Sequence, residues 1–105
     1  MSARLAYVYS DDFLKYDFGP GHPLTPIRLK LTYELSRAKG LFDDKKIKVV
    51  PPRVATEEDV RLFHSQEYVN LVKRMSKSGH GLLDLGDTPA FNGVYEASAM
   101  AVGAT

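Results

Sequence analysis

The segment from residue 16 to residue 40 constrains the fold of this chain more than any other. It opens with glycine and proline packed around one histidine, at residues 19–23 (Gly-Pro-Gly-His-Pro). Proline fixes φ and glycine permits positive φ, so such a loop adopts a defined shape. Thr25 is then a candidate N-cap and Pro26 the first helical residue, which places Arg28 in the first turn of a helix. Loops of fixed shape that lead into helices often carry the sites of α/β proteins.

Two short apolar runs predict strands. Residues 5–9 (Leu-Ala-Tyr-Val-Tyr) have no polar face, which is typical of a strand covered on both sides. Residues 47–50 form a second β-branched run, which two prolines end. A helical segment separates the two runs. This strand–helix–strand order favours an α/β fold with a parallel pair of strands.

Helical signals follow each strand. The helix after Pro26 repeats apolar residues every three or four positions and ends at Lys39–Gly40. Thr56 begins a Ser/Thr-x-x-acid cap pattern, Ser65 caps a longer helix, and residues 94–104 form a helix of small residues that suits close packing on a sheet. The Ser65 helix carries an apolar stripe that we expect in the core. The stripe consists of Tyr68, Leu71, Val72 and Met75.

Composition limits the classes of function. The chain has 105 residues, a formal net charge of +1 and no cysteine. This charge gives no electrostatic basis for binding nucleic acid or a membrane surface. The absence of cysteine excludes disulfides, thiolate zinc ligands and a thiol nucleophile, and it suits a reducing compartment. No apolar run approaches the ~20 residues that span a bilayer. We therefore expect a cytoplasmic protein with no nucleic acid and no membrane partner.

Three segments, in order, carry a family resemblance. They are GPGHPLTPIR with the helix that follows it, ATEEDVRLFHSQEYVNLV at residues 55–72, and GDTPAFNGVYEASAMAVGAT at residues 86–105. Together they resemble the N-terminal part of the histone deacetylase superfamily, in particular its acetoin utilization (AcuC-like) branch and the related acetylpolyamine amidohydrolases. The resemblance implies that residues 1–105 form a single partial domain. This would be the N-terminal part of an arginase/deacetylase-like three-layer fold with a parallel sheet, contributing two short parallel strands and about four helices.

The resemblance also implies a zinc-dependent deacetylase as the parent protein, which hydrolyses N-acetyl amides on an acetylated protein or a small acetylated amine. In that family an Asp/His/Asp metal site activates water, and a histidine pair transfers protons. This chain holds neither a His-His pair nor an Asp-x-His motif. We therefore expect no catalytic residue and no metal ligand in these 105 residues, and zinc only in the full-length parent. The chain alone should be inactive, and it should self-associate through the strand edge and apolar face that it leaves uncovered.

Four residues match family positions outside the catalytic centre. Arg28 matches an arginine that lines an internal channel beneath the active site, which suits a guanidinium that binds carboxylates. His22 would lie beside that channel, or its ring nitrogens would simply tie the loop to nearby backbone. Phe18 falls where some members have a tyrosine, so the hydroxyl is missing here. Asp87 matches a substrate-binding rim aspartate that accepts hydrogen bonds from peptide N–H groups.

Two of these residues, and the chain as a whole, also have a second interpretation. Arg28 would otherwise be a surface arginine in an ordinary salt bridge, and Asp87 a turn residue in Gly-Asp-Thr-Pro. The whole chain would otherwise be a freestanding, non-catalytic α/β binding module derived from the deacetylase fold. Stoichiometric zinc together with deacetylase activity in the purified chain would exclude that module.

Overall fold

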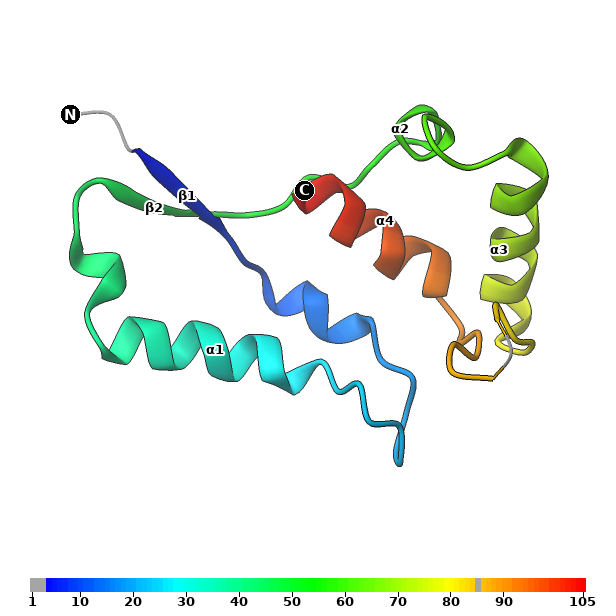
Figure 1. Cartoon of the computed structure of the whole chain (residues 1–105), viewed down its shortest axis with the longest axis horizontal. Coiled ribbons are helices and arrows are strands. Elements are labelled where there is room, and N and C mark those ends of the chain that lie inside the picture. Colours follow the sequence, from blue (N-terminus) through cyan, green and yellow to red (C-terminus); the bar gives the residue numbers. More distant parts are fainter. Residues whose placement is uncertain (1–3, 85) are drawn as a thin grey trace.

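The computed structural model describes residues 4–84 and 86–105, and in these residues it contains two strands and four α-helices (Figure 1). The strands β1 and β2 pair in parallel, as the strand–helix–strand order predicted, and Leu5 lies opposite Ile47. None of the described helices is long and apolar enough to cross a membrane. The elements are β1 (Leu5–Val8), α1 (Ile27–Ala38), β2 (Ile47–Val50), α2 (Glu57–Arg61), α3 (Gln66–Ser78) and α4 (Val94–Ala104), with 3-10 turns at Asp11–Lys15 and Leu41–Asp43.

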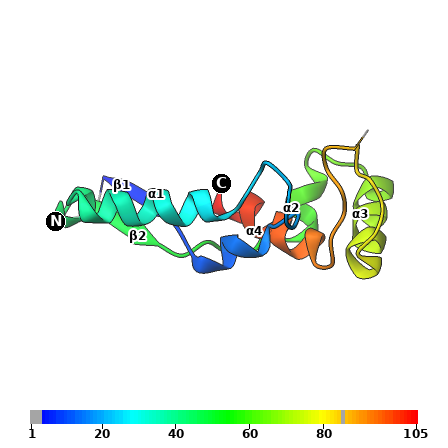
Figure 2. The ribbon, with the colours of Figure 1, turned by 90° about the horizontal axis from the view of Figure 1, so that it is seen from below.

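The molecule is extended for its length. Its radius of gyration is 16.0 Å, whereas a compact domain of this size has a radius of about 13 Å. Figure 1 shows β1, β2 and α1 at one end and α3 at the other, with α4 between them, and Figure 2 shows the same arrangement as a thin slab. The accessible surface is 7592 Å². This is roughly 1,700 Å² more than a folded monomer of this mass exposes.

The buried core is small and lies between α3 and α4. Val69 on α3 and Val94 on α4 are the largest fully buried side chains, each 1 % exposed. The other buried apolar residues are all alanines, which bring backbones together but bury little surface. A core of this size supplies little hydrophobic stabilisation, because that stabilisation scales with the apolar area removed from water. The buried alanines are Ala55, Ala90, Ala97 and Ala99.

Helix α4 lies against the segment that follows β2. The Ala55 N–H donates to the Ala99 carbonyl over 2.9 Å. One turn further on, Gly103 approaches the Arg53 carbonyl so closely that a Cβ atom would overlap it. The small residues predicted to allow close packing do so, but against this extended segment instead of the sheet.

Helix α1 is apolar on two opposite faces. Its inner face holds Tyr33, whose ring stacks on Tyr9 of the segment after β1 with centroids 4.3 Å apart. Its outer face carries the predicted apolar stripe, but Ile27, Leu31 and Leu35 are 47–61 % exposed. The expectation that the first strand is covered on both sides is also wrong for this chain, since the first half of β1 is exposed. The pattern identified apolar faces correctly, but nothing in the described residues covers them.

Two predicted helix caps are confirmed and one is wrong. Thr56 forms a capping box at α2, and the Ser65 side chain accepts from the Tyr68 N–H in the first turn of α3. Thr25 does not cap α1. The helix begins at Ile27, one residue later than predicted, and Pro26 occupies the flanking position with no side-chain cap.

The inward face of α3 is displaced from the predicted stripe. Ser76 is buried at 3 % exposure, whereas Tyr68 is 38 % exposed. The Ser76 hydroxyl accepts from the Tyr95 N–H over 3.1 Å and donates to the Glu96 carboxylate over 2.9 Å. Ser76 thereby caps α4, whose own N-cap residue Gly93 has no side chain to do so. This polar contact explains why α3 turns Ser76 inward.

Candidate functional site: two loops joined by a histidine

The candidate site lies where two loops meet. We call residues 16–26 the Gly-Pro loop and residues 79–93 the α3–α4 loop, of which Leu85 lies outside the described residues. Three aromatic rings join the loops: Tyr16, Phe18 and Phe91. Each pair packs edge to face, with ring centroids 5.2 or 5.7 Å apart. Edge-to-face packing of aromatic rings is favourable beyond the area that it buries, so this aromatic cluster holds the two loops together.

His22 connects the loops through its ring nitrogens. Its ring lies on Phe18, with centroids 4.4 Å apart. Nδ1 accepts from the Leu24 N–H over 3.1 Å, and Nε2 lies 2.7 Å from the Asp87 carbonyl oxygen. Because Nδ1 acts as an acceptor, Nε2 carries the proton and donates to that carbonyl. Of the two interpretations of His22, the geometry agrees with the one in which the ring ties the loop to backbone.

A second anchor holds the α3–α4 loop from within. The Asp84 carboxylate accepts from the Gly86 N–H over 2.9 Å, and from both the N–H and the hydroxyl of Thr88 over 2.8 Å. These bonds, with that from Gly86 contributing most, lower the pKa of Asp84 below its ordinary value. The ionised carboxylate therefore binds the backbone on both sides of Asp87. Sequence reasoning missed Asp84, although an aspartate two residues before a glycine is a recognisable turn signal.

Asp87 is exposed at the tip of this braced loop. Its carbonyl is bound by His22, but its carboxylate accepts no hydrogen bond from residues 4–84 or 86–105. A carboxylate in this position can accept hydrogen bonds from a ligand.

Arg28 lies apart from the other predicted site residues. It lies beside a cavity of about 360 Å³ between the Gly-Pro loop, α1 and α4. Its guanidinium is exposed and forms no ion pair in the described part of the chain, so the ordinary salt bridge considered above is not found. Phe18 and His22 do not line this cavity. The cavity is lined by Arg28, Phe13, Tyr16, Leu24, Pro26, Leu29, Ala97, Ser98, Ala101 and Val102.

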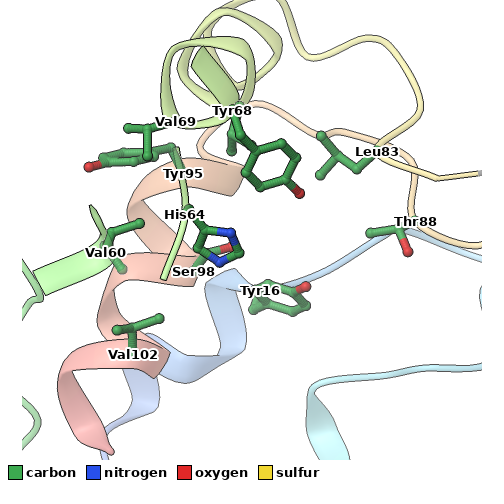
Figure 3. Close-up of a pocket in the computed structure, with 12 residues that line it drawn as sticks. Tyr16, Val60, His64, Tyr68, Val69, Leu83, Thr88, Tyr95, Ser98 and Val102 are labelled. Atoms are coloured by element: carbon green, nitrogen blue, oxygen red, sulfur yellow. The ribbon is translucent and has the colours of Figure 1, made fainter. Parts of the chain in front are cut away.

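A second cavity, of about 260 Å³, lies on the other side of Tyr16. Figure 3 shows the side chains of Tyr16, His64 and Tyr68 gathered around it, beside α4. The remaining wall is mainly apolar and includes Val69 and Leu83. The sequence contained no signal for this cavity, because its walls come from both loops and three helices.

The described residues do not fit the zinc that the resemblance implies. Within residues 4–84 and 86–105, no three His, Cys, Asp or Glu side chains lie close enough to hold a metal ion. Both nitrogens of His22 are engaged with backbone groups. No step of a metal-dependent reaction is therefore assigned to residues of this chain.

Comparison with known proteins identifies the family. The model of the histone deacetylase domain matches residues 22–105. The chain therefore belongs to the histone deacetylase family. It is 36% identical over 106 residues to the acetoin utilization protein AcuC of Bacillus subtilis (strain 168), covering 94% of this chain and 27% of that protein. It is 42% identical over 82 residues to AcuC of Staphylococcus aureus (strain COL), covering 78% of this chain and 20% of that protein.

The fold agrees with this assignment. A crystal structure of the HDA15 HD domain superposes with a TM-score of 0.82 at 21% identity, covering 97% of this chain and 29% of that one. At this identity the match shows the fold alone, and the predicted deacetylase-like α/β fold is confirmed. The chain spans about a quarter of the length of the curated relatives that it matches.

Proposed function

We propose that this chain is a segment of a cytoplasmic zinc-dependent deacetylase that hydrolyses N-acetyl amides of the acetyl-lysine type. Residues 1–105 would form a single partial domain that shapes the substrate-binding surface. The observation that carries the proposal is the exposed Asp87 carboxylate, on a loop anchored on both sides, in a member of the deacetylase family. Zinc and the groups that react around it would be supplied by residues outside this sequence.

Asp87 would act as the rim residue for a peptide substrate. A peptide that carries acetyl-lysine presents backbone N–H groups beside the modified side chain, and an exposed carboxylate can accept hydrogen bonds from them. Hydrogen bonds to a charged group contribute about 1.5–3 kcal/mol in a favourable site. A small acetylated amine has no such backbone groups. Asp87 would therefore favour peptides over small amines.

Arg28 would keep its channel role. Its side chain lies beside a largely apolar cavity. A carboxylate such as released acetate would form paired, charge-assisted hydrogen bonds with the guanidinium there. For His22 and Phe18 the channel role rests on the resemblance alone, because neither residue lines this cavity and both contact the α3–α4 loop.

Replacing Asp87 with alanine in the full-length enzyme tests the rim role. We expect kcat/KM for an acetyl-lysine peptide to fall on the order of tenfold, which corresponds to the loss of about one charged hydrogen bond. The rate with a small acetylated amine should change less than about twofold. Glu58→Ala, at an exposed residue of α2, is the matched control and should alter neither rate. Equal losses on both substrates would refute the rim role.

The isolated chain should self-associate. Its surplus accessible surface of roughly 1,700 Å² matches what one partner contributes to an obligate interface of 2,000–5,000 Å² in total. In the complete deacetylase fold, the remaining chain would cover this surface. Light scattering over a concentration series should give an average mass that rises above 11.7 kDa. A constant monomer mass would contradict the expectation.

The outer face of α1 supplies the variant for this experiment. Leu31→Lys places a charge in the middle of the exposed stripe and should reduce the average mass. Leu82→Lys is the matched control, because Leu82 is a leucine of nearly the same exposure that lies on the α3–α4 loop.

A further inference from the structure

We infer that His22 is the positioning residue of the Asp87 rim, so that the Gly-Pro loop sets the preference for peptide over small-amine substrates. This inference rests on the proposed rim function of Asp87. It assigns to His22 a role in substrate specificity in place of the channel role that the resemblance implied.

A direct hydrogen bond joins His22 to Asp87. The Nε2–H of His22 donates to the Asp87 carbonyl over 2.7 Å, across 65 residues of sequence. Within the described residues, this is the single hydrogen bond between the Gly-Pro loop and the α3–α4 loop. The residue that it binds is Asp87, whose carboxylate accepts no hydrogen bond from residues 4–84 or 86–105. The bond therefore places the backbone of Asp87 while leaving its side chain free.

His22 is itself held in place. Nδ1 accepts from the Leu24 N–H, which selects the tautomer with its proton on Nε2. The ring lies on Phe18, which packs in turn on Phe91 of the opposite loop. Gly21, next to His22, has a φ of 85°, a conformation that other residues rarely adopt. Backbone, stacking and hydrogen bond thus all fix one orientation of the ring.

His22 and Asp84 anchor the α3–α4 loop from different sides. Asp84 binds the α3–α4 loop from within, through Gly86 and Thr88. His22 binds it from outside, at the residue between them. Loss of His22 would leave the internal turn formed but let it open more often, because one of its two anchors is gone, and it would release the position of the loop relative to the Gly-Pro loop. The expected effect is therefore on substrate binding through Asp87, with the fold preserved.

Kinetics of the full-length enzyme test the inference. His22→Ala should raise KM for an acetyl-lysine peptide about fivefold and change kcat less than twofold, with a small acetylated amine unaffected. His22→Gln should recover at least half of the loss, because its amide N–H can donate to the Asp87 carbonyl. His80→Ala, at an exposed histidine of the α3–α4 loop, is the matched control and should change neither constant.

A double-mutant cycle separates positioning from a general structural effect. In the Asp87→Ala background, His22→Ala should have no further effect on the peptide, because the group that it positions is gone. Additive losses in the double variant, or equal losses on the small amine, would overturn the inference.

Amide hydrogen exchange needs no substrate, so it tests the positioning role of His22 separately from the rim function of Asp87. Amide hydrogen exchange at Thr88 should quicken at least tenfold in His22→Ala, whereas exchange at Gly93, whose N–H donates to the Ser76 carbonyl, should not change. If Asp87→Ala leaves peptide turnover intact, the rim function fails whatever the exchange shows. If Asp87→Ala impairs turnover but exchange at Thr88 is unchanged in His22→Ala, the positioning role of His22 is overturned.

Discussion

Gly103→Ala should destabilise this chain by about 3 kcal/mol, although alanine normally stabilises an α-helix by about 1 kcal/mol relative to glycine. The reason is the contact between α4 and the segment after β2. A Cβ atom on Gly103 would overlap the Arg53 carbonyl and lie 2.7 Å from the Ala55 nitrogen. Both are backbone atoms, which cannot rotate away as a side chain would. Helix α4 must shift, and the hydrogen bond from Ala55 to Ala99 must lengthen with it.

Thermal unfolding at one fixed protein concentration measures this effect, because self-association makes the midpoint depend on concentration. A loss of this size lowers Tm by roughly 12 °C or more in a domain of this length. The control is Ala101→Gly, at an exposed position of the same helix, which should cost only about 1 kcal/mol. A Tm for Gly103→Ala that is unchanged or raised would show that α4 and the Arg53 segment do not approach as described.

Ser76→Ala should cost about 2 kcal/mol of stability. The substitution removes one oxygen that makes two hydrogen bonds, one from the Tyr95 N–H and one to the Glu96 carboxylate. The Tyr95 N–H belongs to the first turn of α4, where no residue of the helix can accept it. Because Ser76 is almost fully buried, water cannot easily replace the lost acceptor.

The matched control for this second prediction is Ser78→Ala on the same helix. Ser78 is exposed, and its hydroxyl donates to the Met75 and His80 carbonyls and accepts from the His80 N–H. Water can replace these exposed backbone partners, so the loss of the hydroxyl should cost less than about 0.5 kcal/mol. Urea unfolding of the two variants gives the comparison. Similar losses in both would mean that the Ser76 hydroxyl does not cap α4.

The elements that the sequence predicted well depend on short-range patterns. The strand at residues 47–50 and the helix at residues 94–104 have the predicted bounds. The caps at Thr56 and Ser65 bind N–H groups three residues away, which is why a local pattern reveals them. The start of α1 was misplaced by one residue, because both Thr25 and Pro26 can begin a helix and local propensity does not choose between them.

The site was only partly predictable, because its bonds join distant parts of the chain. The resemblance identified His22, Phe18 and Asp87 separately, but no spacing rule shows that His22 binds the Asp87 carbonyl 65 residues away. The partner of Ser76 likewise lies on another helix. The apolar stripe of α1 was read correctly as a face to be covered, yet periodicity does not say which part of a fold covers it.

The capping of α4 by Ser76 has a consequence for the order in which the structure forms. Ser76 and Tyr95 are only 19 residues apart, so joining them closes a short loop and costs little chain entropy. The pairing of Leu5 with Ile47 and the bond from His22 to Asp87 each close a much longer one. We therefore expect the α3–α4 hairpin to nucleate early and the Gly-Pro loop to dock onto it late. The surface proposed to bind peptide substrates would be the last part of this chain to fold.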